Sequence, residues 1–300
     1  MSSIFEGTMT LNNWKEIEKY SKEGAKVLFP LGVIEEHGPH ISLGSDINWS
    51  HAISLRVREK LRELGSESVV APPYYWGVNH CTGGFPGSFS LRPETMQQVL
   101  FEIFENLKNF GFLEVYCFNY HGDSLHVKSI VDSIKRANAE LGLCVKLVLE
   151  AMDLGLYGWT GNEDFLLVYK PDYLLEWFEE IEPNEQGLFD IHAGAYETAV
   201  MNYFCPEQVD INVALSLKSS SLDNDGMKKW LQGGGVTKEV VPLGYAGNPA
   251  GYRMVEKHVK EIIDLQVQDI VGQIVILRNN IYEITNIRCR CNWLLVCGLI

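Results

Sequence analysis

The stretch "AKVLFPLGVIEEHGPHISLGSDINWSHAISLRVREKLRELG", residues 25–65, contains a predicted strand, a polar loop and a predicted helix. The apolar run 25–31 is typical of a buried strand, whereas apolar residues at helical spacing from Ile47 to Leu61 predict a helix that stops at Gly65. The loop between them holds two glutamates, two histidines and an aspartate. A strand, a loop and an amphipathic helix in this order are typical of α/β proteins.

The same alternation continues along the chain. Further strands are predicted at 68–73, 113–120 and 144–150, and further helices at 92–111, 123–142, 194–209 and 253–274. Helices between strands imply crossover connections, which make neighbouring strands parallel. We therefore predict a three-layer α/β/α fold with a mainly parallel sheet.

The domain organisation follows from length and composition. A chain of 300 residues with 46% hydrophobic residues is large enough for a sizeable core. The stretch 216–251 is rich in Ser, Gly, Asn and Asp, which predicts surface loops or a lid, since the helix predicted after it still needs a core to pack on. We expect one domain over residues 1–272, followed by a tail at 273–300 to which the sequence assigns no role.

Charge and hydropathy exclude several classes of protein. The net charge of −14, from 39 acidic and 25 basic residues, argues against a nucleic-acid partner, because phosphate binding needs a basic surface. No stretch approaches the roughly 20 apolar residues of a membrane span, and the N-terminus lacks the basic and apolar regions of a signal peptide. We expect a cytoplasmic protein that binds neither nucleic acid nor membrane.

Two loops at predicted strand ends carry histidine and carboxylate side chains. Glu35, His37 and Asp46 follow the first strand, and His121 and Asp123 follow a later one, so all five are expected at one edge of the sheet, where parallel α/β proteins bind ligands. Residues two apart point to the same side of an extended chain, so each loop could provide one ligand to each of two metal ions. Such ligands suit Zn²⁺, Mn²⁺ or Fe²⁺, with Asp46 as a candidate bridge between the ions. Alternatively, the histidines are structural hydrogen-bonding groups and the two aspartates cap helices.

Three other segments contain candidate site residues. His192 and Glu197 lie in "FDIHAGAYETAV", where a glycine allows close backbone approach and the carboxylate falls in the first turn of a predicted helix. His80 precedes the glycine-rich "CTGGFPG", which either closes over a substrate or forms a simple turn. Trp159 either lines a pocket or packs in the core. The sequence contains no GxSxG elbow, phosphate loop, HExxH helix or GxGxxG turn after the first strand, so nucleophilic-serine and nucleotide chemistries lack support.

Several segments together resemble the creatininase (creatinine amidohydrolase) superfamily. The family pattern Gly-x-x-Glu-x-His-Gly-Pro-His-x-x-x-x-x-Asp is matched by "GVIEEHGPHISLGSD", its Asn-x-His segment by "NYHGDS", and its His-Ala-Gly-x-x-Glu-Thr segment by "HAGAYET". Weaker similarities are "FPGSFSL" and "GYAGNPAGY", the latter with Asn248 where the family has Asp. The resemblance extends over about residues 25–253 in the same order and implies a creatininase-like version of the predicted fold.

The resemblance implies a set of metal ligands. Glu35, Asp46 and His121 would bind one divalent ion, and His37 and Asp46 would bind a second. The last ligand of creatininase itself is a Glu two residues after the metal-binding His, where this chain has Asp123, one methylene shorter. In relatives with Gly at that position we expect the carboxylate of the "HAGAYET" segment to contribute instead, which here is Glu197.

Other residues receive supporting roles from the same resemblance. His192 becomes a candidate proton carrier that would protonate the departing nitrogen. Tyr120, in the position before the metal-binding His where relatives commonly have Gly, would narrow the pocket. Apart from the resemblance, Glu36 lies beside two ligands in the sequence and could orient His37 or His40, so we expect Glu36 and His40 to support the site.

The activity implied is that of a metal-dependent amidohydrolase with two divalent ions (Zn, Mn or Fe). It would cleave a non-peptide amide C–N bond of a small molecule through a metal-activated water, with a cyclic amide as one option. Alternatives are a formamide hydrolase, a peptide-trimming member of the superfamily, a hydrolase or lyase acting on another bond, and an inactive metal- or small-molecule-binding protein. The resemblance also implies a homo-oligomer, because family members are usually oligomers and often hexamers.

Overall fold

A five-stranded parallel sheet forms the centre of the protein. The computed structural model describes residues 3–173 and 191–296, and the side chains within them as far as residue 277. The strand order is β2-β1-β3-β4-β5, and every neighbouring pair is parallel. The strands are β1 (Lys26–Leu31), β2 (Ser68–Val70), β3 (Glu114–Asn119), β4 (Cys144–Glu150) and β5 (Leu166–Tyr169). The prediction of a parallel α/β fold is confirmed.

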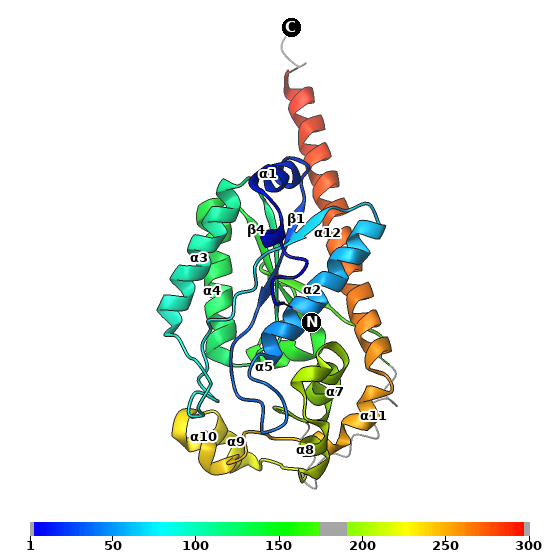
Figure 1. Ribbon diagram of the computed structural model, residues 1–300. Helices are drawn as coiled ribbons and strands as arrows, with labels where there is room; N and C mark the ends of the chain where they lie inside the picture. The colour runs from blue at the N-terminus through cyan, green and yellow to red at the C-terminus, as the bar shows by residue number, and fades with distance from the viewer. Residues whose placement is uncertain (1–2, 174–190, 297–300) are drawn as a thin grey trace.

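Helices cover both faces of the sheet and complete three layers. Helices α3 (Pro93–Asn109) and α4 (Ser124–Leu141) lie on one side, and α2 (Ser45–Glu63), α7 (Ala195–Phe204) and α12 (Val259–Val296) lie on the other (Figure 1). Strand β1 is buried along its whole length, as expected for a parallel strand covered on both faces.

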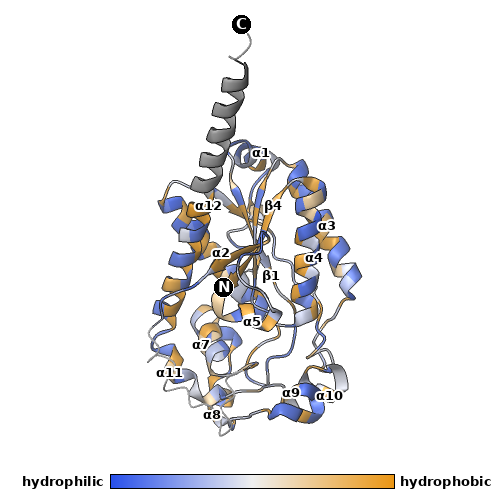
Figure 2. Cartoon of the chain, turned by 180° about the vertical axis from the view of Figure 1, so that it is seen from behind, coloured by the Kyte–Doolittle hydropathy of each residue, from blue (hydrophilic) through white to orange (hydrophobic). Residues whose placement is uncertain are grey.

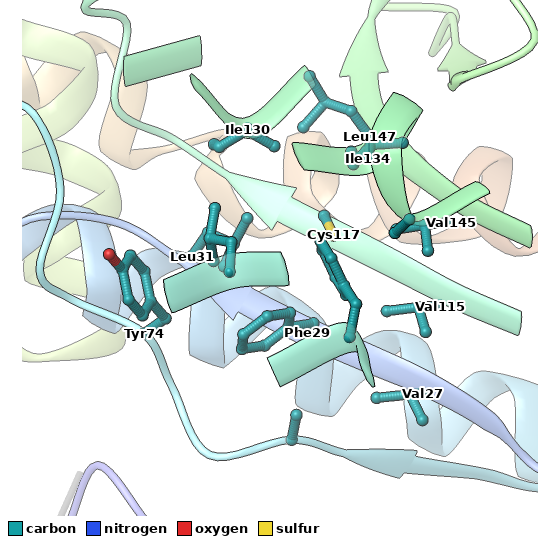
Figure 3. Close-up of a cluster of buried hydrophobic side chains, with 14 of the residues drawn as sticks. Val27, Phe29, Leu31, Tyr74, Val115, Cys117, Ile130, Ile134, Val145 and Leu147 are labelled. Carbon is teal, nitrogen blue, oxygen red and sulfur yellow. The ribbon is translucent and has the colours of Figure 1, made fainter. Parts of the chain in front are cut away.

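Two apolar cores hold the layers together, one on each face. Phe29 of β1 and Cys117 of β3 face Ile130 and Ile134 of α4 in the first core (Figure 3). The alternate strand residues, among them Leu28, point to the opposite core with α2 and α12. Figure 2 shows the hydrophobic residues on the strands and on the helix faces turned toward them.

Short helices fill the connections, and several were not predicted. The remaining elements are η1 (Met9–Leu11), α1 (Trp14–Lys22), η2 (Ala151–Asp153), α5 (Leu154–Tyr157), η3 (Pro206–Gln208), α8 (Ile211–Ser216), α9 (Asn224–Trp230), α10 (Gly234–Val240), η4 (Pro249–Gly251) and α11 (Tyr252–Glu256). Helices α8, α9 and α10 gather at the end of the molecule opposite to α1 (Figure 1). The stretch 216–251, predicted as loops or a lid, therefore contains α9, α10 and η4.

The C-terminal helix differs from the predicted one in both bounds. The segment 253–274 divides into α11 and α12, and α12 continues to Val296. Ile274 is buried against the core, so the predicted domain boundary at residue 272 falls within a continuous helix that packs on the sheet. Over the described residues, no helix combines the length and the apolar character needed to cross a membrane.

Candidate metal centre

The loops after β1 and β3 meet at one edge of the sheet, as the sequence predicts. Gly32, just after β1, allows α2 to approach closely. A Cβ at this position would lie 2.9 Å from the backbone nitrogen of Ile47 and 3.1 Å from the carbonyl carbon of Asp46. The first turn of α2 therefore packs directly on the end of β1. This close approach places Asp46 beside the β1 loop.

Glu35, Asp46 and His121 form one compact cluster. His121 Nδ1 lies 2.8 Å from Glu35 Oε1 and 3.4 Å from Asp46 Oδ2, and all three residues are buried. His121 Nε2 donates to the carbonyl of Val78 at 3.1 Å, so Nδ1 is the atom turned to the carboxylates. The second oxygen of Glu35 accepts a hydrogen bond from the Thr82 hydroxyl.

His37 extends the cluster on the other side of Asp46. Its Nε2 lies 3.2 Å from Asp46 Oδ1 and 4.0 Å from Glu197 Oε2. Its Nδ1 donates to the carbonyl of Glu35 at 3.2 Å, which turns Nε2 inward. Asp46 thus stands between His121 and His37, with one oxygen near each ring.

This donor set fits divalent metal ions. Ligand atoms of Glu35, Asp46 and His121 lie within 4.8 Å of one another, as do those of Glu35, His37 and His192. His37 Nε2 and Asp46 Oδ2 are buried and make no hydrogen bond of good geometry within the described chain. Buried polar atoms are nearly always paired. Metal-binding histidines typically donate their other ring N–H to a carboxylate, a backbone carbonyl or water, and His37 and His121 each donate to a backbone carbonyl. Nitrogen and carboxylate ligands of this kind suit zinc, manganese or iron.

The electrostatics of the cluster are those of tightly packed opposite charges. Burial by itself would lower the pKa of His37, but the Asp46 carboxylate outweighs it and raises this pKa to about 9. Burial likewise opposes the charge of His121, yet Glu35 and Asp46 hold its pKa well above the usual range. Burial would raise the pKa of Asp46, whereas His37 and His121 lower it far below its ordinary value. The carboxylates therefore require positive charge next to them, which protons or metal ions can provide.

His192 is held beside the cluster by a short backbone ladder. Its backbone carbonyl accepts from Ala246 N–H at 2.9 Å, and its Nε2 donates to the carbonyl of Glu36 at 2.8 Å, with Glu36 Oε1 at 3.5 Å. Burial would lower the pKa of His192, but the carboxylates of Glu36, Glu35 and Glu197 together outweigh it and raise this pKa to about 10. Gly244, at φ +73°, makes room for Glu36, because a Cβ there would collide with the carboxylate.

Glu197 reaches the cluster from the first turn of α7. Its Oε2 accepts the backbone N–H of Ala193 at 2.5 Å, and burial raises its pKa. Ala193 has the left-handed φ of +51°, a strained conformation that is found most often at functional sites. The turn between His192 and α7 thus directs both candidate side chains to the same place.

His40 lies next to the cluster and packs against α7. Its Nε2 lies 3.0 Å from the Thr198 hydroxyl, which in turn donates to the carbonyl of Gly194 at 2.5 Å. Burial lowers the pKa of His40 to about 4, so the ring is neutral. These contacts tie the β1 loop to α7.

Asp123 lies at the N-terminus of α4. Its Oδ1 accepts from the backbone N–H groups of Leu125 and His126, at 2.9 and 3.3 Å. Its Oδ2 accepts from those of His80 and Cys81, at 2.8 and 3.0 Å. Both oxygens therefore bind backbone, as in the helix-capping alternative, and Asp123 belongs to neither of the clusters described above. His80 takes part through its backbone, while its side chain is exposed.

A cavity of about 350 Å³ opens beside the metal centre. His121, His192 and Glu197 line it, and so does Tyr120, which stacks on Trp49 with ring centroids 4.3 Å apart. Neither His80 nor Trp159 is among the described residues of its wall; Trp159 instead packs on the rings of Tyr157 and Phe165, at 4.8 and 5.5 Å.

Several residues of the site have no counterpart among the predicted ones. They are Thr82, whose hydroxyl bonds to Glu35, and the cavity-lining Trp49, Glu150, Tyr196 and Gln266. Glu150 could have been anticipated, since it ends a predicted strand at the edge where the metal ligands lie. The others lie within helices or loops, where nothing in the local sequence separates a wall residue from a core residue.

One protein family matches most of the chain. The family model of creatininase, described as creatinine amidohydrolase, matches residues 10–274. The creatinine amidohydrolase of Pseudomonas putida is 27% identical over 216 residues, covering 70% of this chain and 75% of that protein. The mycofactocin precursor peptide peptidase of Mycobacterium ulcerans (strain Agy99) is 24% identical over 254 residues, covering 83% and 84%.

Solved structures share the fold. A mutant creatininase complexed with creatine superposes with a TM-score of 0.65 at 20% identity, covering 89% of this chain and 97% of the other. A structure described as creatininase Mn gives a TM-score of 0.60 at 19% identity, with the same coverage. With a family model that spans most of the sequence, the chain belongs to the creatininase (creatinine amidohydrolase) family of hydrolases.

Proposed function

We propose that this protein is a metal-dependent amidohydrolase that cleaves a non-peptide amide C–N bond of a small molecule. The observation that carries the proposal is a buried cluster of histidines and carboxylates in which His37 Nε2 and Asp46 Oδ2 make no hydrogen bond of good geometry within the described residues. Two of its histidines, His121 and His192, line a cavity. A cyclic amide is one substrate that fits the proposal.

The ligands are assigned by their positions in the cluster. Glu35, Asp46 and His121 would hold one divalent ion, and His37 and Asp46 would hold the second. Glu197, with its Oε2 4.0 Å from His37 Nε2, would complete the second set. Zinc, manganese and iron all suit these ligands.

The chemistry divides between the ions and the protein. Divalent ions in such a site supply a water that ionises near neutral pH and polarise a carbonyl oxygen. His192 donates a hydrogen bond from Nε2 to the Glu36 carbonyl. Its Nδ1 is therefore the atom that would transfer a proton to the departing nitrogen. Tyr120 and Trp49 form a stacked aromatic wall that would position the substrate and exclude water.

The proposal is tested with the purified full-length chain. We expect bound transition metal by elemental analysis, and hydrolysis in a screen of small amides that follows the released amine and carboxylate. Chelation should abolish turnover and added Mn²⁺, Zn²⁺ or Fe²⁺ should restore it. The double variant Glu35→Gln, His121→Ala should lose both metal and activity.

His258→Ala is the matched control, because His258 lies away from the cluster, in the surface turn between α11 and α12, where its Nδ1 is 3.7 Å from Glu261 Oε2. It should keep wild-type metal content and rate. Metal-free protein with full activity, or a fully active double variant, would show that the proposal is wrong.

A second candidate activity is the trimming of a peptide. The similarity to the mycofactocin precursor peptide peptidase, over 83% of this chain, favours it. The same screen separates the two, because a peptidase would release amino acids or short peptides from a peptide library and leave small amides intact. Light scattering of the same sample, in multiples of the 33.9 kDa protomer, tests the prediction of a homo-oligomer.

A further inference from the structure

Two carboxylates line the cavity on the side formed by β4 and η2. Glu150 is the last residue of β4, and Asp153 follows in η2. Both are partly buried, and neither has a Lys, Arg or His partner within 4.0 Å in the described parts of the chain. Burial, and then the negative charge of Asp153, raises the pKa of Glu150 to about 7. Two carboxyl groups thus share a partly buried wall, and among the described residues no cationic side chain pairs with either of them.

The buried side-chain amide of Gln266, beside Glu150, provides another hydrogen-bond acceptor. Gln266 of α12 is 1% exposed, and its Nε2 lies 3.4 Å from Glu150 Oε2 and donates to the hydroxyl of Tyr173 at 2.8 Å. Its Oε1 has no hydrogen-bond partner within the described residues, although Gln266 belongs to the cavity wall. A buried acceptor left unpaired is unfavourable, so a ligand that donates a hydrogen bond would be stabilised here.

Aromatic side chains surround this acceptor group. Tyr120, Tyr157, Tyr169 and Tyr196 line the same cavity, and the Tyr169 hydroxyl lies 3.3 Å from Glu150 Oε2. Tyrosine side chains are neutral near pH 7, so these four add ring faces rather than charge. Aromatic faces attract cations, whereas an anion would meet two carboxylates.

We propose that Glu150, Asp153 and Gln266 form a subsite for an organic nitrogen cation, such as a protonated amine, carried by the substrate. The proposal rests on the proposed function, because the cavity joins this subsite to His121, His192 and Glu197. The substrate would place its cationic group against β4 and η2 and its amide against the metal centre. Glu150 and Asp153 are then specificity residues that select positively charged amides.

The test measures binding rather than turnover. Benzylammonium, benzylguanidinium and the neutral benzyl alcohol are titrated calorimetrically into the metal-loaded full chain at pH 8. We expect at least one of the two cations to bind tenfold or more tightly than the alcohol. The tighter cation identifies the nitrogen group that the subsite prefers.

Charge-neutral variants locate the binding. Glu150→Gln and Asp153→Asn should each lose about tenfold or more in affinity for the cation and leave affinity for the alcohol unchanged. Glu105→Gln removes the same charge from the exposed face of α3 and should bind like wild type. Melting curves of all variants confirm that they fold.

A wild-type measurement keeps the test decisive if a variant fails to fold. Among the described residues, the groups that face Glu150 are Asp153, Gln266 and four tyrosines, Tyr120, Tyr169, Tyr173 and Tyr196. A cation bound there lowers the pKa of Glu150, so at pH 7 its binding should release up to about half a proton, seen as a heat that depends on the ionisation enthalpy of the buffer. Benzyl alcohol should release none.

Equal affinities for cation and alcohol, or cation affinity retained in both variants, would overturn the inference. Neither result depends on catalysis, so it would leave the proposed function in place. Conversely, cation selectivity in a protein that holds no metal and hydrolyses no amide would contradict the proposed function alone.

Discussion

At the scale of single residues, the candidate metal centre depends on which atoms are already paired. His37 and His121 each donate one ring N–H to a backbone carbonyl, so the other nitrogen of each ring is turned to the carboxylates. Glu35 has one oxygen bound by Thr82 and the other 2.8 Å from His121 Nδ1. These hydrogen bonds thus orient each candidate ligand without a bound metal ion.

Thr82→Val tests this orientation. The change keeps the shape of the side chain and removes the hydroxyl that donates to Glu35. We expect metal affinity to fall by about 10- to 100-fold, the usual effect of losing a group that orients a ligand. Titration with a metal-buffered indicator measures it.

Thr8→Val is the control for this change. Thr8 is similarly buried, and its hydroxyl donates to the Phe5 carbonyl at 2.8 Å, in the N-terminal turn before η1. Metal affinity should not change in this variant. If both variants lose affinity alike, the Thr82 hydroxyl has no specific effect on Glu35.

Asp123→Ala separates a capping role from a ligand role. The Asp123 carboxylate accepts hydrogen bonds from four backbone N–H groups. Removing the carboxylate should lower the free energy of unfolding by about 2 kcal/mol, measured by urea denaturation. The metal stoichiometry should stay at its wild-type value. A stoichiometry reduced by one ion would assign Asp123 to the second site instead.

At the scale of elements, the contact between β1 and α2 positions Asp46, the candidate bridging carboxylate. Asp46 lies in the first turn of α2, and its place relative to Glu35 and His37 depends on how closely that turn approaches the end of β1. Gly32 permits the approach because it has no side chain.

Gly32→Ala should therefore damage the site through the backbone. The added Cβ would lie 2.9–3.1 Å from the backbone of Asp46 and Ile47, so the first turn of α2 must shift. We expect a loss of about 1–3 kcal/mol in the free energy of unfolding, typical of overpacking, together with weaker metal binding.

Gly272→Ala makes the same chemical change in α12, where a Cβ would meet nothing within 4 Å. It should stabilise the protein by up to about 1 kcal/mol, because Ala favours the helix. Denaturation curves measure the change in the free energy of unfolding for each variant. Changes of opposite sign support the packing argument, and changes of the same sign contradict it.

At the scale of the whole molecule, the sheet gathers segments that are distant in the chain. The cluster combines residues after β1, residues after β3 and the first turn of α7, which belong to different layers. A bound metal would therefore link the layers, so removing it should lower the stability of the whole fold.

Chelation should lower the melting temperature of the wild-type protein by at least about 5 °C. A ligand at 100 times its Kd adds about 2.7 kcal/mol, and a domain of this size shifts by about 2–4 °C per kcal/mol. Differential scanning calorimetry measures the shift. The variant Glu35→Gln, His121→Ala should not respond to the chelator, and an equal response there would mean that the shift has another origin.

Much of this molecule could be predicted from local patterns. The strands β1, β3 and β4 and the helices α2, α3 and α4 are strongly apolar or strongly periodic, so their type and approximate bounds are evident in the sequence. Strand β5 and helices α9 and α10 are short and weakly patterned. Their formation depends on packing against other elements rather than on local preference.

The sequence by itself determined the parallel α/β architecture and the gathering of histidine and carboxylate side chains near one sheet edge, because hydrophobic period and motif spacing are local properties. Only the tertiary structure decided that Glu197 lies near His37 while Asp123 binds backbone N–H groups. It also brought Glu150 and Gln266 into one cavity wall with the metal centre. These distances depend on how separate layers pack, and that information is spread over the whole chain.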